Sequence, residues 1–298
     1  MLTTLDCLPC FLKQAIHTAR LCTSSPAGQQ EIASEVIRDF LPFIDFNLSP
    51  PENAVHLYAL IADISGQPDP FAELKRESNR FAAAMAPLIR QKVLAADKPL
   101  LAALRFAIAG NIIDYGSLHQ FDMHQTIHDA LSPAMAINDF AELENDLRQA
   151  ERILYLGDNC GELVFDKIAI ETMKRDLTFV VKEQAIINDA LPEDARECGL
   201  PEVCRVTTNG TGCPGTPLPH CSTQFRQLFA EADLIISKGQ GNFETLSEVH
   251  APLYFLLTVK CPVVNDHLVQ LTGSPAGWPT QLPFPVLLKS PRFTKTRK

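Results

Sequence analysis

Long apolar runs and a surplus of basic residues are both absent from this sequence. No stretch approaches the ~20 apolar residues that a membrane-spanning helix needs, so we expect no contact with a membrane. Residues 1–21 carry Asp6 and have no basic segment ahead of an apolar core, which argues against a secretory signal. With 26 basic and 35 acidic residues, the formal net charge of -9 argues against nucleic acid as a partner.

A cysteine pattern typical of a disulfide framework is also absent. The nine cysteines are odd in number and scattered, which suits a reducing cytoplasm better than a disulfide framework. Cys7 and Cys10 form a lone C-x-x-C without the second pair that a structural zinc site needs. We therefore expect a cytoplasmic protein with a reduced thiol pair on its first helix.

Several functional motifs are incomplete. There is no Gly-x-Ser-x-Gly elbow, which disfavours a serine hydrolase. Residues 207–212 offer hydroxyl and glycine N–H groups but lack the lysine of a Walker loop, and in residues 238–244 Glu244 replaces the third glycine of a dinucleotide-binding loop. His124 and His128 have metal-binding spacing, but Gln125 stands where a zincin has glutamate. Hydrolysis at a serine or at a zincin-type zinc site is thus disfavoured.

The first half of the chain has helical periodicity. With 298 residues, 46% of them apolar, the chain is long enough to bury a large core. Apolar residues recur at helical spacing from Leu8 to about Leu147, and prolines at positions 26, 50, 51, 68 and 70 separate the segments. We predict a helical domain over residues 1–149.

The second half alternates short apolar runs with helical stretches, which predicts parallel strands with helices on both faces of the sheet. Because the crossovers between parallel strands are right-handed, the carboxyl ends of these strands open on one edge. The tail from Gly273 to Pro291 is rich in proline, and we expect it to wrap the domain, with a loose basic end at residues 289–298. We predict a second domain over residues 150–298, with strands at residues 153–156, 177–181, 203–206, 234–237 and 253–259.

Oxygen ligands follow two of these strands. Asp158, Asn159 and Asp189 supply two carboxylates and an amide, a set that suits Mg²⁺, Mn²⁺ or a similar octahedral cation better than zinc. As an alternative, Asp158 and Asp189 simply cap helices, a common use of aspartate at such turns. Spacing alone leaves the two interpretations equally weighted.

Phosphate-binding groups stand at the same predicted edge. Gly161 permits backbone N–H groups to approach an anion, and the helix that begins near Glu162 directs its positive end there. Lys238 and Lys260 follow further strands, where each would offset the charge of a phosphate or would simply be solvated.

Taken together, these residues give the chain a resemblance to the damage-control phosphatases, a family also called domain of unknown function 89. The resemblance spans nearly the whole chain and rests on several motifs in one order. They are Cys7–Cys10, Asp69–Phe71 with Lys75 and Asn79, Gly110–Gly116, Asp158–Glu162, Asn188–Asp189, Ala232–Thr245 and Val259–Lys260. In the eukaryotic branches the segment that matches residues 238–242 differs, so the chain is most similar to the stand-alone prokaryotic branch.

The resemblance implies an α/β fold in which a helical N-terminal region packs on a Rossmann-like, mainly parallel sheet. It also implies phosphatase activity with a divalent cation (Mg²⁺, Mn²⁺, Co²⁺ or Ni²⁺), often on sugar phosphates or damaged phosphometabolites. The matching positions place the cation, and with it the catalytic centre, on Asp158, Asn159 and Asp189. The substrate-binding positions that we predict are Asn111, Asp114, Glu162, Asn188, Asn209, Gly210, Lys238, Asn242 and Lys260.

The predicted reaction is in-line displacement at phosphorus. Either water or one of the carboxylates is the nucleophile, and the sequence leaves both open. Two other functions compete: a methyltransferase that uses S-adenosylmethionine, because residues 157–162 also fit a Rossmann-like first turn, and a sensor that binds a metabolite through a metal without catalysis.

Overall fold

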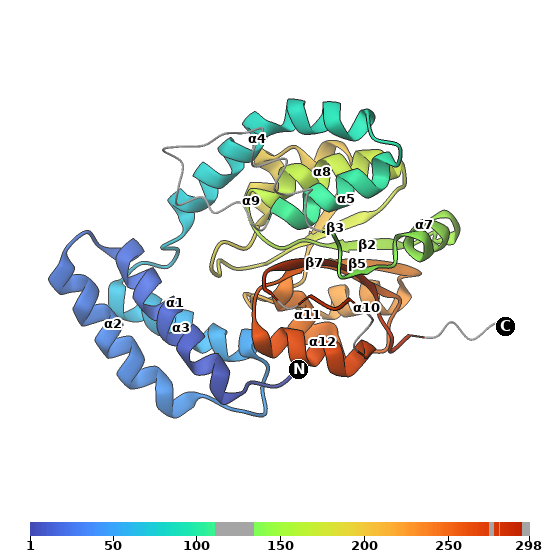
Figure 1. The fold of residues 1–298 in the computed structure, drawn as a ribbon. Coiled ribbons are helices and arrows are strands. Elements are labelled where there is room, and N and C mark those ends of the chain that lie inside the picture. Colours follow the sequence, from blue (N-terminus) through green and yellow to red (C-terminus); the bar gives the residue numbers. More distant parts are fainter. Residues whose placement is uncertain (111–133, 274–276, 280, 294–298) are drawn as a thin grey trace.

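A seven-stranded sheet forms the centre of the molecule, in the order β1-β7-β6-β5-β2-β3-β4 (Figure 1). The structure is a computed structural model that describes residues 1–110, 134–273, 277–279 and 281–293. Strands β2 to β6 are parallel, whereas β7 pairs antiparallel with β6, and β1 pairs parallel with β7. The strands are β1 (Ile137–Asn138), β2 (Ile153–Leu156), β3 (Thr178–Val181), β4 (Arg205–Thr208), β5 (Leu234–Lys238), β6 (Leu253–Val259) and β7 (Phe284–Lys289).

Helices cover both faces of this sheet. One face carries α4 (Ala72–Leu94), α5 (Pro99–Ala109), α7 (Phe140–Gln149), α8 (Glu162–Met173) and α9 (Pro192–Glu197). The other carries α10 (Thr223–Glu231), α11 (Gln240–Leu246) and α12 (Pro262–Thr272). Short 3-10 helices in the described chain are η1 (Leu5–Cys7), η2 (Leu41–Phe43), η5 (Leu200–Glu202) and η6 (Leu218–His220).

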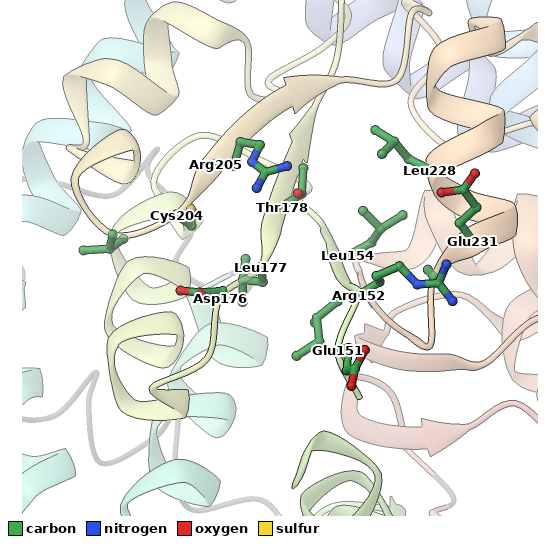
Figure 2. A pocket seen from close by; sticks show the side chains of 13 residues that line it. Glu151, Arg152, Leu154, Asp176, Leu177, Thr178, Cys204, Arg205, Leu228 and Glu231 are labelled. Atoms are coloured by element: carbon green, nitrogen blue, oxygen red, sulfur yellow. The ribbon is translucent and has the colours of Figure 1, made fainter. Parts of the chain in front are cut away.

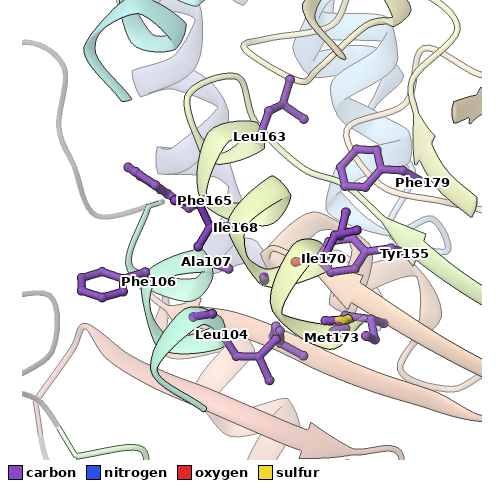
Figure 3. Close-up of a cluster of buried hydrophobic side chains, with 14 of the residues drawn as sticks. Leu104, Phe106, Ala107, Tyr155, Leu163, Phe165, Ile168, Ile170, Met173 and Phe179 are labelled. Carbon is purple, nitrogen blue, oxygen red and sulfur yellow. The ribbon is translucent and has the colours of Figure 1, made fainter. Parts of the chain in front are cut away.

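Strand β2 shows why the sheet is buried on both sides. Its four residues are all apolar and buried, with Ile153 and Tyr155 in the core under α5 and α8, and Leu154 and Leu156 in the core under α10 to α12. Side chains alternate along a strand, so a continuous apolar run fills two cores at once. Figure 3 shows the first of these cores, where α5 and α8 pack together above the sheet.

The first three long helices form a separate bundle. They are α1 (Leu8–Cys22), α2 (Pro26–Phe40) and α3 (Pro50–Ser65), and they share a core that includes Phe11, Phe40 and Leu57. Helix α3 begins at a capping box between Ser49 and Glu52 and ends at a left-handed Gly66. The bundle meets the sheet domain where α3 contacts α11.

The predicted fold class is confirmed: helices in the N-terminal part pack on a mainly parallel sheet with helices on both faces. Within the stretch predicted to be helical, residues 137–138 form β1, and α4 and α5 share a core with the sheet. The division at residue 149/150 stays a prediction.

Two sequence predictions about strands were wrong. The proline-rich tail was expected only to wrap the domain, but residues 284–289 form β7, an internal antiparallel strand. Pro285 stands near its start, where the missing N–H costs few ladder hydrogen bonds. The strand expected at residues 203–206 lies instead at Arg205–Thr208, because Val203 belongs to the turn after η5.

The strand order reverses between β2 and β5. The chain continues from β2 to β3 and β4 on one side, and returns through α10 to β5 and β6 on the other. Open α/β sheets bind ligands at the carboxyl ends of the strands beside such a reversal. In the described parts of the chain, no helix is long and apolar enough to cross a bilayer.

Candidate functional site

Two loops meet at the reversal of the strand order. The loop after β2 carries Asp158 and Asn159, and the loop after β5 begins with Gly239. Gly239 has φ 80° and ψ 165°, and a Cβ built on it would lie 1.9 Å from Oδ2 of Asp158. Only glycine readily adopts this backbone conformation, and only glycine leaves room for the carboxylate.

Backbone hydrogen bonds bring a third segment to the same place. The N–H of Cys160 donates to the carbonyl of Asn188 at 2.8 Å, and the N–H of Ala190 donates to the carbonyl of Asp158 at 2.9 Å. These bonds form an isolated antiparallel bridge between Asn159 and Asp189. The three residues predicted to bind a cation are therefore held side by side by the main chain.

The Asn159 side chain has a defined orientation. Its Nδ2 donates to Asp158 Oδ2 and to Glu162 Oε1, both at 2.9 Å. Because the amide nitrogen of Asn159 donates to two carboxylates, its side-chain carbonyl oxygen is the atom that can bind a ligand.

A buried ion-pair network stands behind Asn159. Lys238 Nζ donates to Glu162 Oε2 at 2.7 Å and to Asp166 Oδ1 at 3.0 Å, and the Tyr155 hydroxyl donates to the same Asp166 oxygen at 2.7 Å. Glu162 and Asp166 stand one turn apart on the same face of α8. In this arrangement Lys238 and Glu162 contact each other, and their predicted role in substrate binding stays a prediction.

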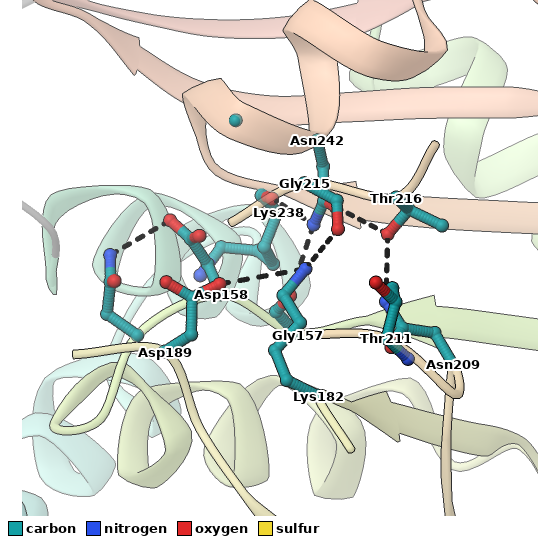
Figure 4. A network of polar contacts seen from close by, with 12 residues as sticks. Gly157, Asp158, Lys182, Asp189, Asn209, Thr211, Gly215, Thr216, Lys238 and Asn242 are labelled. Carbon is teal, nitrogen blue, oxygen red and sulfur yellow. Dashed lines mark hydrogen bonds and ion pairs between the residues drawn. The ribbon is translucent and has the colours of Figure 1, made fainter. Parts of the chain in front are cut away.

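Lys182 is a site residue that our sequence reasoning missed. It directly follows β3, its exposed fraction is 3%, and its Nζ donates to the carbonyl of Gly215 at 2.6 Å. The same Nζ lies 3.6 Å from Asp189 Oδ2, within the network that Figure 4 shows. Lys238 and Lys260 were predicted because each lies at or just past the end of an apolar strand. Lys182 has the same position in the sequence, so the same pattern predicts it.

Four buried carboxylates lie beside two buried ammonium groups. We call Asp158, Glu162, Asp166 and Asp189 the carboxylate cluster; two ammonium groups, those of Lys182 and Lys238, are buried against it. If every group is ionised, the cluster has an excess of two negative charges.

Burial is the main cause of the pKa shifts of Asp158, Asp166 and Asp189. Burial, followed by repulsion from Glu162 and Asp189, raises the pKa of Asp158 well above its usual range. Burial also raises the pKa of Asp189 and that of Asp166 to about 6, although a lysine opposes the shift in each case. Burial alone lowers the pKa of Lys238, but its two carboxylate partners raise it above the ordinary lysine value. Burial is thus the main reason why both predicted carboxylate ligands resist ionisation.

A cavity of about 340 Å³ opens onto the cluster. Asp158, Asn159, Asn188 and Asp189 line it, together with Gln240, Glu244 and Lys260. Its other wall comes from η1, α1, α3 and α12, and includes Cys7, Cys10, Phe11, Ala54 and Val264. The structure therefore brings together five of the predicted site residues around one space: Asp158, Asn159, Asn188, Asp189 and Lys260.

Other predicted residues lie behind this cavity. Asn242 Nδ2 donates to the carbonyls of Gly157 at 3.1 Å and Lys238 at 2.8 Å, and its Oδ1 accepts from Thr216 at 2.7 Å. Asn209 is buried and Gly210 follows it in the loop after β4; neither lines the cavity. Their contact with substrate stays a prediction. Asn111 and Asp114 lie outside the described residues, as do His124 and His128.

A larger cavity, of about 630 Å³, lies at the opposite edge of the sheet (Figure 2). It is lined at the amino ends of β2, β3 and β4 by charged residues such as Arg152, Asp176 and Arg205. Arg152 forms an ion pair with Asp233, with 2.9 Å between its Nη2 and Oδ1 of Asp233. We place the candidate site at the smaller cavity, because ligands of parallel sheets bind at the carboxyl ends of the strands.

The donor set determines which cation would fit. Among the described residues, no three His, Cys, Asp or Glu side chains lie close enough to hold a metal ion together. A cation here would rely on Asp158, Asp189 and the amide oxygen of Asn159, with water or substrate oxygens completing its shell. Asp189 Oδ2 is buried and accepts no hydrogen bond from the described chain, although the Lys182 ammonium lies 3.6 Å away. Two carboxylates and several exchangeable oxygens match the way proteins hold Mg²⁺ and Mn²⁺.

Comparison with known proteins identifies relatives along most of the chain. The family model described as damage-control phosphatase ARMT1-like domain matches residues 3–274. A damage-control phosphatase of Pyrococcus horikoshii is 34% identical over 269 residues, which are 88% of this chain and 93% of the relative. One of Archaeoglobus fulgidus is 32% identical over 274 residues, which are 87% of this chain and 93% of the relative.

A solved structure agrees with these matches. The crystal structure of a DUF89 family protein from Pyrococcus horikoshii superposes with a TM-score of 0.85 at 31% identity, and the match covers 97% of this chain and 99% of that one. On these grounds, the chain belongs to the family of damage-control phosphatase ARMT1-like domains.

Proposed function

We propose that this protein is a phosphatase that depends on a divalent cation and hydrolyses small phosphomonoesters, such as sugar phosphates or damaged phosphometabolites. Two relatives are named damage-control phosphatases, which supports the phosphatase activity. The cation would be held by Asp158, Asn159 and Asp189.

The charge of the carboxylate cluster is the observation that carries the cation requirement. If all four carboxylates are ionised, their charge exceeds that of Lys182 and Lys238 by two, and buried charge of one sign is expensive. A divalent cation supplies the missing charge, and once bound it would polarise a phosphoryl oxygen and help to activate the nucleophile.

The protein's own residues position the reactants. Asp158 and Asp189 are fixed by the backbone bridge, and the amide of Asn159 is oriented by Glu162, which Lys238 holds in turn. Lys260 lies at the cavity wall, where its ammonium group would offset the charge of the substrate phosphate. The apolar wall from α1 and α3 limits water around the reacting group.

The test measures phosphate release from a panel of phosphometabolites with Mg²⁺, Mn²⁺, Co²⁺ or Ni²⁺. We expect activity that a chelator abolishes, and a loss of roughly 100-fold or more in Asp158→Asn and Asp189→Asn, since even outer partners of metal ligands are worth 10–100-fold. Asp176→Asn, at the opposite edge of the sheet, is the matched control and should keep wild-type activity.

Wild-type rates in both site variants would contradict the proposal. Tight binding of a phosphometabolite without phosphate release would favour the metabolite sensor instead. Calorimetric binding of S-adenosylmethionine that survives chelation would favour the methyltransferase.

A further inference from the structure

One buried carboxyl group of the cavity has no part in the mechanism above. Glu244, on α11, has an exposed fraction of 7% and lines the cavity together with Asp158, Asp189 and Lys260. Asp6 also lines it but is solvent-exposed. A buried carboxyl in the wall of a reaction cavity is the usual setting of a proton donor.

Helix geometry directs Glu244 toward the cation site. Side chains on a helix lean toward its amino terminus, and Gln240 Nε2 donates to Glu244 Oε1 at 2.8 Å, one turn nearer that end. Helix α11 begins directly after Gly239, on which the Asp158 carboxylate rests. Glu244 follows Gly239 by five residues, or roughly 7 Å of helix.

The same hydrogen bonds tie Glu244 to the predicted phosphate-binding lysine. Gln240 Oε1 accepts a hydrogen bond of 3.3 Å from the backbone N–H of Lys260. Gln240 thus bridges Lys260 and Glu244, with its oxygen toward one and its nitrogen toward the other. The Glu244 carboxyl receives this one hydrogen bond from the described residues, to Oε1, which leaves Oε2 without one.

We propose that Glu244 is the general acid that protonates the leaving-group oxygen of the phosphomonoester. The inference rests on the proposed phosphatase activity and adds a catalytic residue to it. A bond forms between phosphorus and the nucleophile's oxygen while the bond between phosphorus and the ester oxygen breaks. The ester oxygen takes the proton of Glu244 and leaves as an alcohol, and the water consumed in the reaction returns a proton to Glu244.

The surroundings keep this carboxyl protonated near neutral pH. Burial raises the pKa of Glu244 to about 7, although the hydrogen bond from Gln240 and the amino group of Met1 both lower it. Met1 N also donates to the carbonyl of Glu244 at 2.6 Å. The other titratable groups that line the cavity with it are Asp6 and Cys7 of η1, Cys10 of α1, Asp158 and Asp189, and Lys260 and Cys261 after β6.

The test compares two leaving groups in Glu244→Gln, a variant that retains the hydrogen bond to Gln240. The alkoxide that leaves an alkyl phosphate is a strong base and needs the proton. The p-nitrophenolate that leaves p-nitrophenyl phosphate is a weak base and does not. We expect kcat to fall by about 10²–10⁴-fold for the alkyl phosphate, and by less than about tenfold for p-nitrophenyl phosphate. Glu248→Gln, just past the same helix and paired with Arg292, is the matched control and should leave both rates unchanged.

The wild-type protein gives a second measurement that needs no variant. Because the acid must be protonated to act, the rate with the alkyl phosphate should fall as pH rises through the Glu244 pKa, and this fall should be missing with p-nitrophenyl phosphate. Equal losses for both substrates, or no loss, would overturn the assignment of Glu244 while leaving the phosphatase intact. A wild-type protein without cation-dependent activity on either substrate would overturn the proposed function, and this inference with it.

Discussion

The Asp158 carboxylate rests against Gly239, where any side chain would collide with it. A neighbouring residue is strained in turn: Ile187, just before Asn188 and Asp189, has a φ of 46°. A β-branched residue rarely adopts this conformation, which costs about 1–2 kcal/mol. The bridge between Asn159 and Asp189 holds this loop in place, and the strained backbone positions the side chains that we predict to bind the cation.

A substitution at Gly239 should therefore impair cation binding. Gly239→Ala would push the Asp158 carboxylate aside, and we expect the affinity for Mn²⁺ to fall by at least about tenfold, a loss comparable with that of an outer partner. Calorimetric titration measures it. Gly273→Ala is the matched control, because Gly273 has φ 76° and ψ 170° with nothing within 4 Å of an added Cβ. Equal Mn²⁺ affinity in the two variants would show that contact with Asp158 does not matter.

At the scale of the elements, Lys238 ties three of them together. It ends β5 and pairs with Glu162 and Asp166 of α8, while Tyr155 of β2 donates to Asp166. All four side chains are buried. The position of α8, and with it that of Asn159, thus depends on a charged contact inside the core.

Removal of this lysine should destabilise the fold strongly. Lys238→Met leaves two buried carboxylates without their partner, and breaking a buried pair in this way costs roughly 3–5 kcal/mol of unfolding free energy. Lys289→Met is the matched control: Lys289 also ends a strand and pairs with Asp146 at 2.6 Å, but its side chain is 35% exposed. We expect about 0–1 kcal/mol there. Similar losses in urea titrations of the two variants would refute the role of burial.

The elements also show what a sequence can predict. Strands β2 and β6 have the predicted bounds, because each is a run of apolar residues, which in β6 is broken only by Thr258. Strand β7 was missed because Pro283 and Pro285 interrupt its pattern, and its antiparallel partner is set by tertiary pairing. The strand order places Asp158 and Asp189 at one edge of the sheet, as predicted. The local sequence pattern does not predict that the side chains of Lys182 and Lys238 are buried.

At the scale of the whole molecule, the cavity lies between the sheet and the bundle of α1 to α3, which has its own core. The sheet supplies the carboxylates, and the bundle of α1 to α3 supplies the apolar wall. The net charge of -9 repels phosphate esters and attracts cations. We infer that cation binding precedes and enables the binding of substrate.

The stability of the whole protein should depend jointly on pH and cation. The pKa of Asp189 is raised to about 6, from about 3.9 in an unfolded chain, and that of Asp166 is also raised to about 6. Between about pH 4 and pH 6 the folded state therefore holds protons that the unfolded state has released. The free energy of unfolding of the metal-free protein falls as pH rises through this window, and the stabilisation is lost above about pH 6.

A bound cation reverses this trend, because it binds the ionised carboxylates and takes the place of the protons. At 100 times its Kd it adds about 2.7 kcal/mol at neutral pH, a rise of a few degrees in Tm. We expect Mn²⁺ to raise Tm clearly at about pH 7.5 and little at about pH 5, where protons compete for the same oxygens. Asp158→Asn should lose the Mn²⁺ effect while Asp189 and Asp166 keep the downward slope of the metal-free protein. An equal rise in Tm at both pH values would mean that the cation binds elsewhere than at the buried carboxylates.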